Sequence, residues 1–237
     1  MESDSLKERK IAIVTGAAGN LGQAVVKKFI DENFFVAGTI TQHDIAANEF
    51  SADKYETTMV DLRDEQSTQK FVEDVISKHN KIDAAILTAG GFAMGKIADT
   101  KINDIIHQFT LNFETAYNTA RPVFLQMMKQ NSGRIFLIGS KPGLTAKEGK
   151  GKVAYSLAKS LIFRLAELMN DEAKGKNVVV NVIVPGTIDT PPNRKSMPDA
   201  DFNKWTKAED IADVIYWHCT AEAASLRENI IKVYNDA

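Results

Sequence analysis

Seven short apolar runs recur along the chain and predict β-strands. They are rich in β-branched and aromatic residues, and most are apolar throughout rather than alternating with polar residues. Strands of this kind are typical of a parallel sheet that helices cover on both faces. The runs occupy residues 11–15, 34–40, 57–60, 84–88, 134–138, 178–184 and 230–233.

Segments with the helical spacing of apolar residues lie between these strands. They cover residues 21–32, 65–79, 102–129, 153–174 and 208–220. The alternation of strand and helix predicts an α/β fold, a doubly wound parallel sheet of the Rossmann type with about seven strands and helices on both faces. We expect a single domain over residues 1–237, with residues 1–9 as a polar tail, because a chain of this length can bury one large core.

Composition narrows the class of partner. The chain has 29 basic and 31 acidic residues and no long run of either sign, which argues against nucleic acid or an acidic membrane surface. One cysteine, Cys219, and four scattered histidines predict neither an intramolecular disulfide nor a metal site. The charged N-terminus lacks the apolar core of a targeting signal, and no apolar run approaches the roughly 18 residues of a membrane span. We therefore expect a cytoplasmic protein.

A glycine-rich turn, "TGAAGNLG" at residues 15–22, joins the first predicted strand to the first predicted helix. Alone, it is equally well explained as a tight turn that needs glycine. In this position, however, it leaves backbone N–H groups at a helix N-terminus, where a pyrophosphate binds favourably. Gly22 would also let the helix pack closely on the strand.

Tyr155 and Lys159, in "AYSLAKS", lie one helical turn apart on the same face. A nearby ammonium favours a phenolate and lowers the pKa of a phenol from its ordinary value near 10, so the pair could move a proton. By itself the pair is more simply explained as part of a solvated helix face. Ser140 ends a predicted strand and Asn112 lies early in a long predicted helix, where a turn residue and a helix cap are the simpler explanations.

Together, Asn112, Ser140, Tyr155 and Lys159 resemble the catalytic tetrad of the short-chain dehydrogenase/reductase family, and the resemblance runs from residue 10 to about residue 233. It implies an NAD(P)-dependent oxidoreductase that transfers hydride between the nicotinamide C4 and a carbonyl or alcohol substrate. It also implies roles: Tyr155 as acid and base, Lys159 lowering its pKa and binding the nicotinamide ribose, Ser140 polarising the substrate oxygen, and Asn112 holding a water that links Lys159 to solvent.

The same resemblance implies the contacts to NAD or NADP. The turn is similar to the family's "TGxxxGxG", although Asn20 stands where that family usually has glycine. Asp61 would meet the adenine amine and Thr190 the nicotinamide amide. The expected set is Gly16, Asn20, Leu21, Gly22, Thr41, Asp61, Leu62, Ala89, Gly90, Tyr155, Lys159, Pro185, Gly186, Ile188 and Thr190.

The choice between NAD and NADP depends on the end of the second predicted strand. An acidic residue there binds the ribose hydroxyls of NAD, and an arginine accepts the phosphate of NADP. The strand ends on Ile40, and Thr39, Thr41, Gln42 and His43 could hydrogen-bond either cofactor. The sequence leaves the preference open.

A second resemblance concerns the loop "TIDTPPNRKSMPDADFNKW", residues 187–205. It is similar to the corresponding loop of quinonoid dihydropteridine reductases, and reduction of a quinonoid pterin is the alternative function. Ser140 and Ile40 depart from that pattern. Trp205 would be a stacking surface for the pterin or, alternatively, a core residue. A dinucleotide sensor without catalysis is a further alternative, but such proteins commonly lose the Tyr and Lys pair.

The two longest predicted helices, residues 102–129 and 153–174, carry apolar residues on more than one face, which indicates burial between subunits as well as in the core. We therefore expect a homodimer or homotetramer. The residues in question are Phe109, Phe113, Tyr117, Phe124, Leu161, Phe163, Leu165 and Leu168.

Overall fold

The computed structural model describes residues 9–42, 44 and 50–235, so the tail expected at residues 1–9 lies outside it apart from Arg9. Its strands form one sheet in the order β3-β2-β1-β4-β5-β6-β7, with every neighbouring pair parallel. This confirms the predicted fold class. The strands are β1 (Lys10–Thr15), β2 (Phe34–Ile40), β3 (Tyr55–Met59), β4 (Ala84–Leu87), β5 (Ser132–Ile138), β6 (Asn177–Pro185) and β7 (Ile230–Val233).

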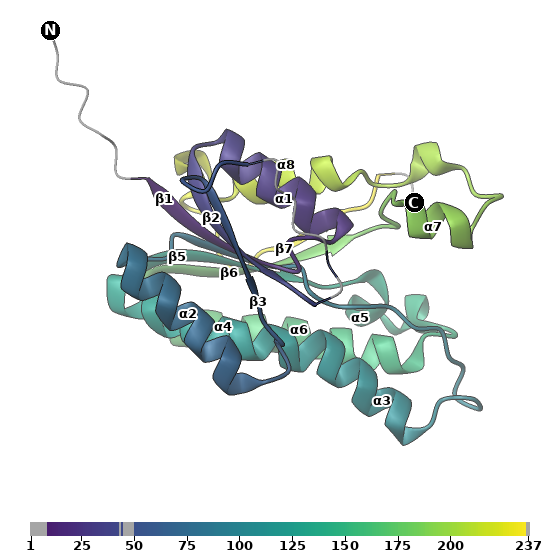
Figure 1. Cartoon of the computed structure of the whole chain (residues 1–237). Helices are drawn as coiled ribbons and strands as arrows, with labels where there is room; N and C mark the ends of the chain where they lie inside the picture. Colours follow the sequence, from purple (N-terminus) through teal and green to yellow (C-terminus); the bar gives the residue numbers. More distant parts are fainter. Residues whose placement is uncertain (1–8, 43, 45–49, 236–237) are drawn as a thin grey trace, which may run out of the picture.

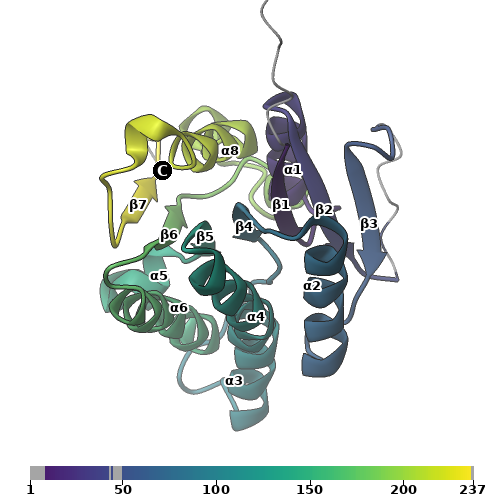
Figure 2. The same ribbon diagram turned by 90° about the vertical axis from the view of Figure 1, so that its left-hand side faces the viewer.

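Helices cover the sheet on both faces (Figures 1 and 2). Helices α1 (Asn20–Asp31) and α8 (Ala208–Trp217) lie on one face, and α2 (Glu65–His79), α4 (Thr115–Gln130) and α6 (Val153–Glu172) lie on the other. Alternate residues of β1 explain the two layers. Ile11 and Ile13 belong to the core beneath the second group of helices, whereas Ala12 and Val14 belong to the core beneath α1 and α8.

One predicted helix is divided in the structure. Residues 102–129 form α3 (Ile102–Phe109), a π-helical turn (Thr110–Glu114) and α4. The prediction of a helix over these residues is confirmed, because the backbone stays helical throughout, but the apolar spacing did not reveal that the backbone hydrogen bonds shift at the π-helical turn. Single π turns of this kind occur frequently at functional sites.

The remaining helices are short. The sequence predicts a loop at residues 187–205, but the structure places α7 (Pro191–Ser196) within its proline- and charge-rich part. A second short helix, α5 (Lys141–Leu144), follows β5. Single 3-10 turns occupy Ala146–Gly149, Phe202–Lys204 and Ala221–Ala223.

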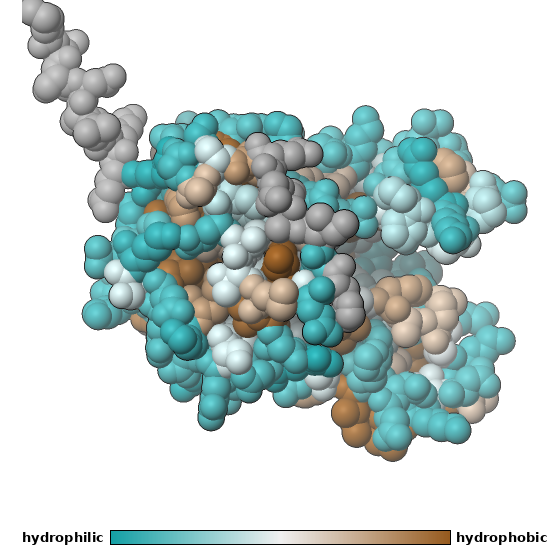
Figure 3. All heavy atoms as spheres, in the orientation of Figure 1, coloured by the Kyte–Doolittle hydropathy of each residue, from teal (hydrophilic) through white to brown (hydrophobic). Residues whose placement is uncertain are grey.

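The carboxyl ends of the strands meet at one edge of the sheet, where ligands of open α/β sheets bind. The strand order reverses between β1 and β4, so the loops after these two strands diverge to opposite faces. The space-filling view shows a hollow at this edge, between the segment that carries α7 and the part that carries α3 and α5 (Figure 3). Among the described residues, no helix is long and apolar enough to cross a membrane.

Candidate active site

The glycine-rich turn connects β1 to α1 at this edge. Gly19 N donates to Gly16 O over 2.9 Å, and Gly19 then precedes the first residue of α1 without a side chain that caps the helix. A Cβ on Gly22 would lie 2.1 Å from Gly16 O, so this contact between helix and turn requires glycine. The uncapped helix start and the bare backbone around it fit a pyrophosphate.

Asn20 begins α1 in a helical conformation, and the left-handed residue of the turn is Gly16, with φ of +61°. The ability of asparagine to adopt a left-handed conformation is therefore not needed at position 20. Leu21 follows in the first turn of the helix, where its side chain is buried against β1 and β2. The turn thus keeps its shape although the family's usual glycine is replaced.

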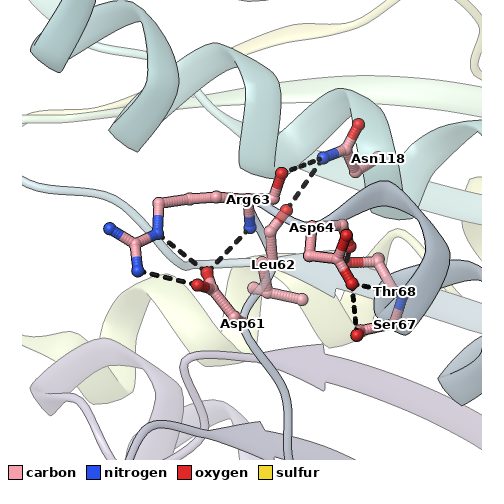
Figure 4. A network of polar contacts seen from close by, with 7 residues as sticks. All are labelled: Asp61, Leu62, Arg63, Asp64, Ser67, Thr68 and Asn118. Carbon is pink, nitrogen blue, oxygen red and sulfur yellow. Dashed lines mark hydrogen bonds and ion pairs between the residues drawn. The ribbon is translucent and has the colours of Figure 1, made fainter.

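Asp61 lies just beyond β3, at the position expected to meet the adenine, and its carboxylate is paired with Arg63 (Figure 4). Arg63 Nε donates to one carboxylate oxygen over 2.8 Å and its terminal nitrogen to the other over 2.7 Å. The hydrogen bonds from Arg63 hold the pKa of Asp61 below its usual value. Asn118 of α4 donates to Leu62 O over 3.0 Å and so ties this segment to the helix layer.

The structure brings a carboxylate that sequence reasoning missed to the end of β2. Asp44 Oδ2 accepts hydrogen bonds from Thr41 N over 2.7 Å and from Thr41 Oγ1 over 2.9 Å. The Asp44 carboxylate thus lies at the end of β2, although Asp44 follows Ile40 by several residues in the sequence. The signal in the sequence is "TQHD", a threonine followed three residues later by an aspartate, which commonly bonds the backbone in this way. His43 lies outside the described residues.

Asn112 lies in the π-helical turn and is buried. Its Oδ1 accepts from Gly91 N over 3.1 Å, and its Nδ2 donates to the backbone oxygen and Oε1 of Gln108, each over 3.2 Å. The side chain is therefore engaged in joining the loop after β4 to the turn. The expected role of Asn112 in holding a water stays a prediction.

The loop after β4 brings Ala89 and Gly90 to the centre of the edge. Ala89 N donates to Thr15 Oγ1 over 3.2 Å, which fixes this loop to the end of β1. A Cβ on Gly90 would lie 2.8 Å from Asn112 Oδ1 and 3.6 Å from Lys159 Nζ. Glycine at this position therefore lets the two polar side chains lie close to the backbone of the loop.

Ser140 follows β5 and caps the short helix α5. Its Oγ accepts a hydrogen bond from Gly143 N over 3.1 Å, and its hydroxyl favours the charged form of Tyr155 and so acts to lower the pKa of that phenol. The side chain is only 5% exposed. Because the cap uses an Oγ lone pair, the Ser140 proton remains available for the Tyr155 oxygen or for a substrate oxygen beside it.

Tyr155 is half-buried on α6, with its ring 5.0 Å from that of Phe92 in an edge-on contact. Burial raises the pKa of Tyr155 above its ordinary value, and the Ser140 hydrogen bond opposes this rise. The net direction differs from the lowering expected from Lys159, because desolvation of the phenol is the larger effect. At neutral pH the phenol is therefore protonated.

Lys159 is buried one turn further along α6. Its Nζ donates to Ile138 O over 2.8 Å and lies 5.9 Å from the centroid of the Tyr155 ring. Burial lowers the pKa of Lys159 to about 8, since the charged form loses solvation. The ammonium form still predominates at neutral pH, and it is close enough to stabilise a phenolate.

The segment after β6 carries the last group of expected contacts. Gly186 N donates to Val233 O over 2.9 Å directly after Pro185, the end of β6. Thr190 caps α7 by accepting a hydrogen bond from Asn193 N over 3.3 Å, and Ile188 pairs with Thr206 at the base of the segment. These contacts fix the backbone of the segment beside the hollow.

Trp205 is 6% exposed and packs on Phe202, with ring centroids 4.8 Å apart. Of the two alternatives for Trp205, the structure confirms the core residue and not the stacking surface for a pterin. A cavity of about 210 Å³ lies between residues 93–100 and α3 and reaches Gln108 and Ala154. Among the described residues, no group of three or more His, Cys, Asp or Glu side chains could hold a metal ion.

The sequence is similar to those of known reductases. The family model described as short chain dehydrogenase matches residues 10–201. The 3-oxoacyl-(acyl-carrier-protein) reductase FabG of Thermotoga maritima is 24% identical over 95% of this chain and 96% of its own length. The acetoacetyl-CoA reductase of an Acinetobacter species is 24% identical over 78% of this chain and 77% of its own.

Solved structures share the fold. A crystal structure of acetoin dehydrogenase from Enterobacter cloacae superposes with a TM-score of 0.83 at 24% identity, covering 94% of this chain and 93% of its own. ElxO with NADP bound superposes with a TM-score of 0.85 at 20% identity, covering 95% of this chain and 97% of its own.

Proposed function

The chain belongs to the short-chain dehydrogenase family, and from this premise we propose that it transfers hydride between a nicotinamide dinucleotide and a carbonyl or alcohol substrate, with Tyr155 as the acid and base. Membership makes it an NAD(P)-dependent oxidoreductase. The glycine-rich turn and the uncapped start of α1 fit the pyrophosphate of such a cofactor. The bound nicotinamide supplies or accepts the hydride.

The observation that carries this proposal is that Ser140, Tyr155 and Lys159 lie together at the carboxyl edge of the sheet: the Ser140 hydroxyl opposes the rise in the pKa of Tyr155, and Lys159 Nζ lies 5.9 Å from the centroid of the Tyr155 ring. Gly143 N donates to Ser140 Oγ over 3.1 Å, which orients one of the two hydroxyls. A substrate oxygen placed between them would receive two hydrogen bonds as negative charge develops on it. Such preorganised donors stabilise the charge in the transition state more than in the ground state.

Tyr155 donates its proton to the substrate oxygen when a carbonyl is reduced. Its raised pKa keeps the phenol protonated before this step, and the buried Lys159 ammonium stabilises the phenolate that remains. In the reverse direction, the phenolate would accept the proton of an alcohol. Reduction is therefore favoured at neutral pH and oxidation at alkaline pH.

The names of the relatives suggest a substrate class. They describe reductases of 3-oxoacyl thioesters and of acetoacetyl-CoA. We infer that a ketone is the preferred substrate, and 3-oxoacyl thioesters are the first compounds to test. Asn112 holds the loop after β4 in place for this reaction through its bond to Gly91.

Turnover assays test the proposal. Wild type and Ser140→Ala are assayed with a panel of ketones and 3-oxoacyl thioesters and with quinonoid dihydropterin, each with NADH and NADPH. We expect turnover of a ketone that falls roughly tenfold to a thousandfold in Ser140→Ala, the range for loss of an oxyanion-type donor. Absence of ketone turnover in the wild type contradicts the proposal.

Reduction of a quinonoid pterin is the alternative that the sequence of residues 187–205 predicted. The relatives reported above are ketone reductases, so the comparisons do not favour it. The same assay separates the two functions. Pterin turnover that is insensitive to Ser140→Ala, with negligible ketone turnover, would support the alternative, because a conjugated ring needs the second donor less.

We also propose that the chain forms a homodimer or homotetramer through α3, α4 and α6. Phe109, Tyr117, Leu161 and Leu168 are exposed on these helices, while Phe124, Phe163 and Leu165 are buried in the core and Phe113 is partly buried. Exposed apolar side chains of this number favour association. Sedimentation of wild type and of Leu168→Glu tests it, since a charge on this surface should shift the protein toward the monomer.

A further inference from the structure

The arm, residues 187–206 between β6 and α8, is a loop whose two ends are tied together. Asp189 N donates to Thr206 O over 2.8 Å, and Thr206 N donates to Thr187 O over 2.9 Å. Thr206 Oγ1 also donates to Val233 O over 3.0 Å, which fastens the base of the arm to β7. The arm projects from the carboxyl edge of the sheet beside the hollow (Figures 1 and 3).

Helix α7 lies in the outer part of the arm and has no buried residue. A helix of six residues is too short to be stable by itself, so its stability must come from side-chain contacts. The Thr190 hydroxyl caps it, and Asn193 Nδ2 donates to Ile188 O over 2.8 Å. These bonds connect the fold of α7 directly to the conformation of residues 188–190.

Arg194 links the start of the arm to its end. Its Nε and a terminal nitrogen donate to the two carboxylate oxygens of Asp189, over 2.6 and 2.7 Å. The guanidinium carbon lies 4.8 Å from the centroid of the Phe202 ring, and Phe202 packs on the buried Trp205. One side chain therefore contacts both a residue before α7 and a residue after it.

We propose that Arg194 is a positioning residue, which keeps α7 folded by holding Asp189 and Phe202 and thereby fixes Ile188 and Thr190 for the nicotinamide. The inference rests on the proposed function, because it assigns to these two residues the expected contacts of a dinucleotide enzyme. The bond to Asp189 uses two donors in one plane, which a lysine cannot supply. A positive charge alone at position 194 is therefore not sufficient to hold Asp189 in this way.

The test compares Arg194→Lys, Arg194→Ala and Asp189→Asn with Lys195→Ala, a matched control at an exposed position of the same helix. Cleavage of the arm is measured without added dinucleotide. Thermolysin is the protease, since the substitutions at Arg194 leave the apolar cleavage sites of the arm intact. Dissociation constants for NADH and NADPH are measured by titration. Steady-state assays give kcat, KM and the pH profile.

We expect the arm of both Arg194 variants and of Asp189→Asn to be cleaved about five- to tenfold faster, because the pair and the ring contact both hold the helix. Dinucleotide affinity should fall by about two- to fivefold, as expected when the binding-competent conformation is less populated. KM for the dinucleotide should rise, while kcat and its pH profile stay unchanged. Lys195→Ala should resemble the wild type in each of these measurements.

Two outcomes would overturn the inference. One is wild-type cleavage and affinity in Arg194→Ala. The other is a double variant, Arg194→Ala with Asp189→Asn, whose effect equals the product of the two single effects, since a pair that acts as a unit is non-additive. Cleavage needs no turnover, so a wild type without ketone activity would contradict the proposed function but leave this measurement interpretable.

Discussion

Where we expect the nicotinamide to bind (the nicotinamide end) the polar side chains are buried, whereas where we expect the adenosine to bind (the adenosine end) they are exposed and charged. Ser140 and Lys159 are each 5% exposed, while the side chains of Asp61 and Arg63 are 51% and 62% exposed. The first group is bonded to backbone groups, Ser140 to Gly143 N and Lys159 to Ile138 O. The second forms a charge pair on the surface.

This difference determines how much each side chain can contribute. A donor that is buried and oriented in advance acts in a medium of low dielectric, where it affects developing charge strongly. An exposed ion pair is screened by water and typically contributes between about 0 and 1 kcal/mol. We therefore expect substitutions at the nicotinamide end to change turnover by orders of magnitude, and those at the adenosine end to change dinucleotide affinity by about tenfold or less.

The largest effect is expected for Tyr155→Phe. The hydroxyl handles the substrate proton, so its removal should reduce kcat by about 10² or more, as for loss of a general acid. Dinucleotide affinity should stay almost unchanged, because the ring and its contact with Phe92 remain. A variant with wild-type turnover would mean that another group transfers the proton.

A smaller but still large effect is expected for Lys159→Met, which removes the buried ammonium. Loss of the charge should lower kcat by roughly tenfold or more and weaken dinucleotide binding. The pKa of Lys159 is about 8, so in the wild type the ammonium is present below this pH and lost above it. Reduction rates of the wild type should therefore fall as the pH rises through about 8.

The pH profile distinguishes this role from a structural one. Lys159→Met should lack the inflection near pH 8, since no ammonium titrates there. Circular dichroism at pH 7 serves as the control for folding, and Lys174→Met, an exposed substitution beyond the end of α6, should keep the wild-type profile. If the inflection persists in Lys159→Met, it belongs to another group.

The sequence predicted the sheet and the shared helix of Tyr155 and Lys159 well, because both depend on short local patterns, while the catalytic roles of these residues stay predictions. Apolar runs specify the strands, and the spacing of Tyr155 and Lys159 specifies a shared helix face. The π-helical turn around Asn112 was not predictable in this way. It changes the hydrogen-bond partners of the backbone while the apolar spacing continues, so the pattern of residue types does not record it.

The adenosine end was less predictable for a related reason. The carboxylate at the end of β2 comes from Asp44, which returns to Thr41 through hydrogen bonds rather than standing in the strand itself. Similarly, α7 forms in a segment rich in proline and charge because Arg194 bonds Asp189 and contacts Phe202. The net shift in the pKa of Tyr155 depends on burial, which a helical spacing does not specify.

At the adenosine end, the larger effect is expected for Asp61→Asn. This change removes the carboxylate that accepts hydrogen bonds from two Arg63 nitrogens. The same carboxylate is expected to meet the adenine amine. Affinity for NAD and NADP should fall alike by about tenfold, which corresponds to roughly 1.4 kcal/mol and to one charge-assisted hydrogen bond. Calorimetric titration measures it, with kcat at saturating dinucleotide expected to stay constant. A drop in kcat as large as that in affinity would show that the two ends of the cleft are not independent.

The smallest effect is expected for Asp44→Asn, and it concerns the difference between the two cofactors. The Asp44 carboxylate lies against Thr41, at the strand end where the adenosine ribose binds in this fold. Its charge disfavours a 2′-phosphate, so the wild type should prefer NAD, and Asn should improve NADP affinity by about two- to fivefold, as expected for an exposed charge. NAD affinity should be unchanged or slightly weaker.

Asp31→Asn, which changes an exposed carboxylate at the far end of α1, is the control for a general change in net charge. An equal gain in NADP affinity in both variants would mean that long-range charge, rather than the position of Asp44, sets the preference. A wild-type preference above about a thousandfold, roughly 4 kcal/mol, would exceed what this exposed carboxylate can supply and would require a further charged contact.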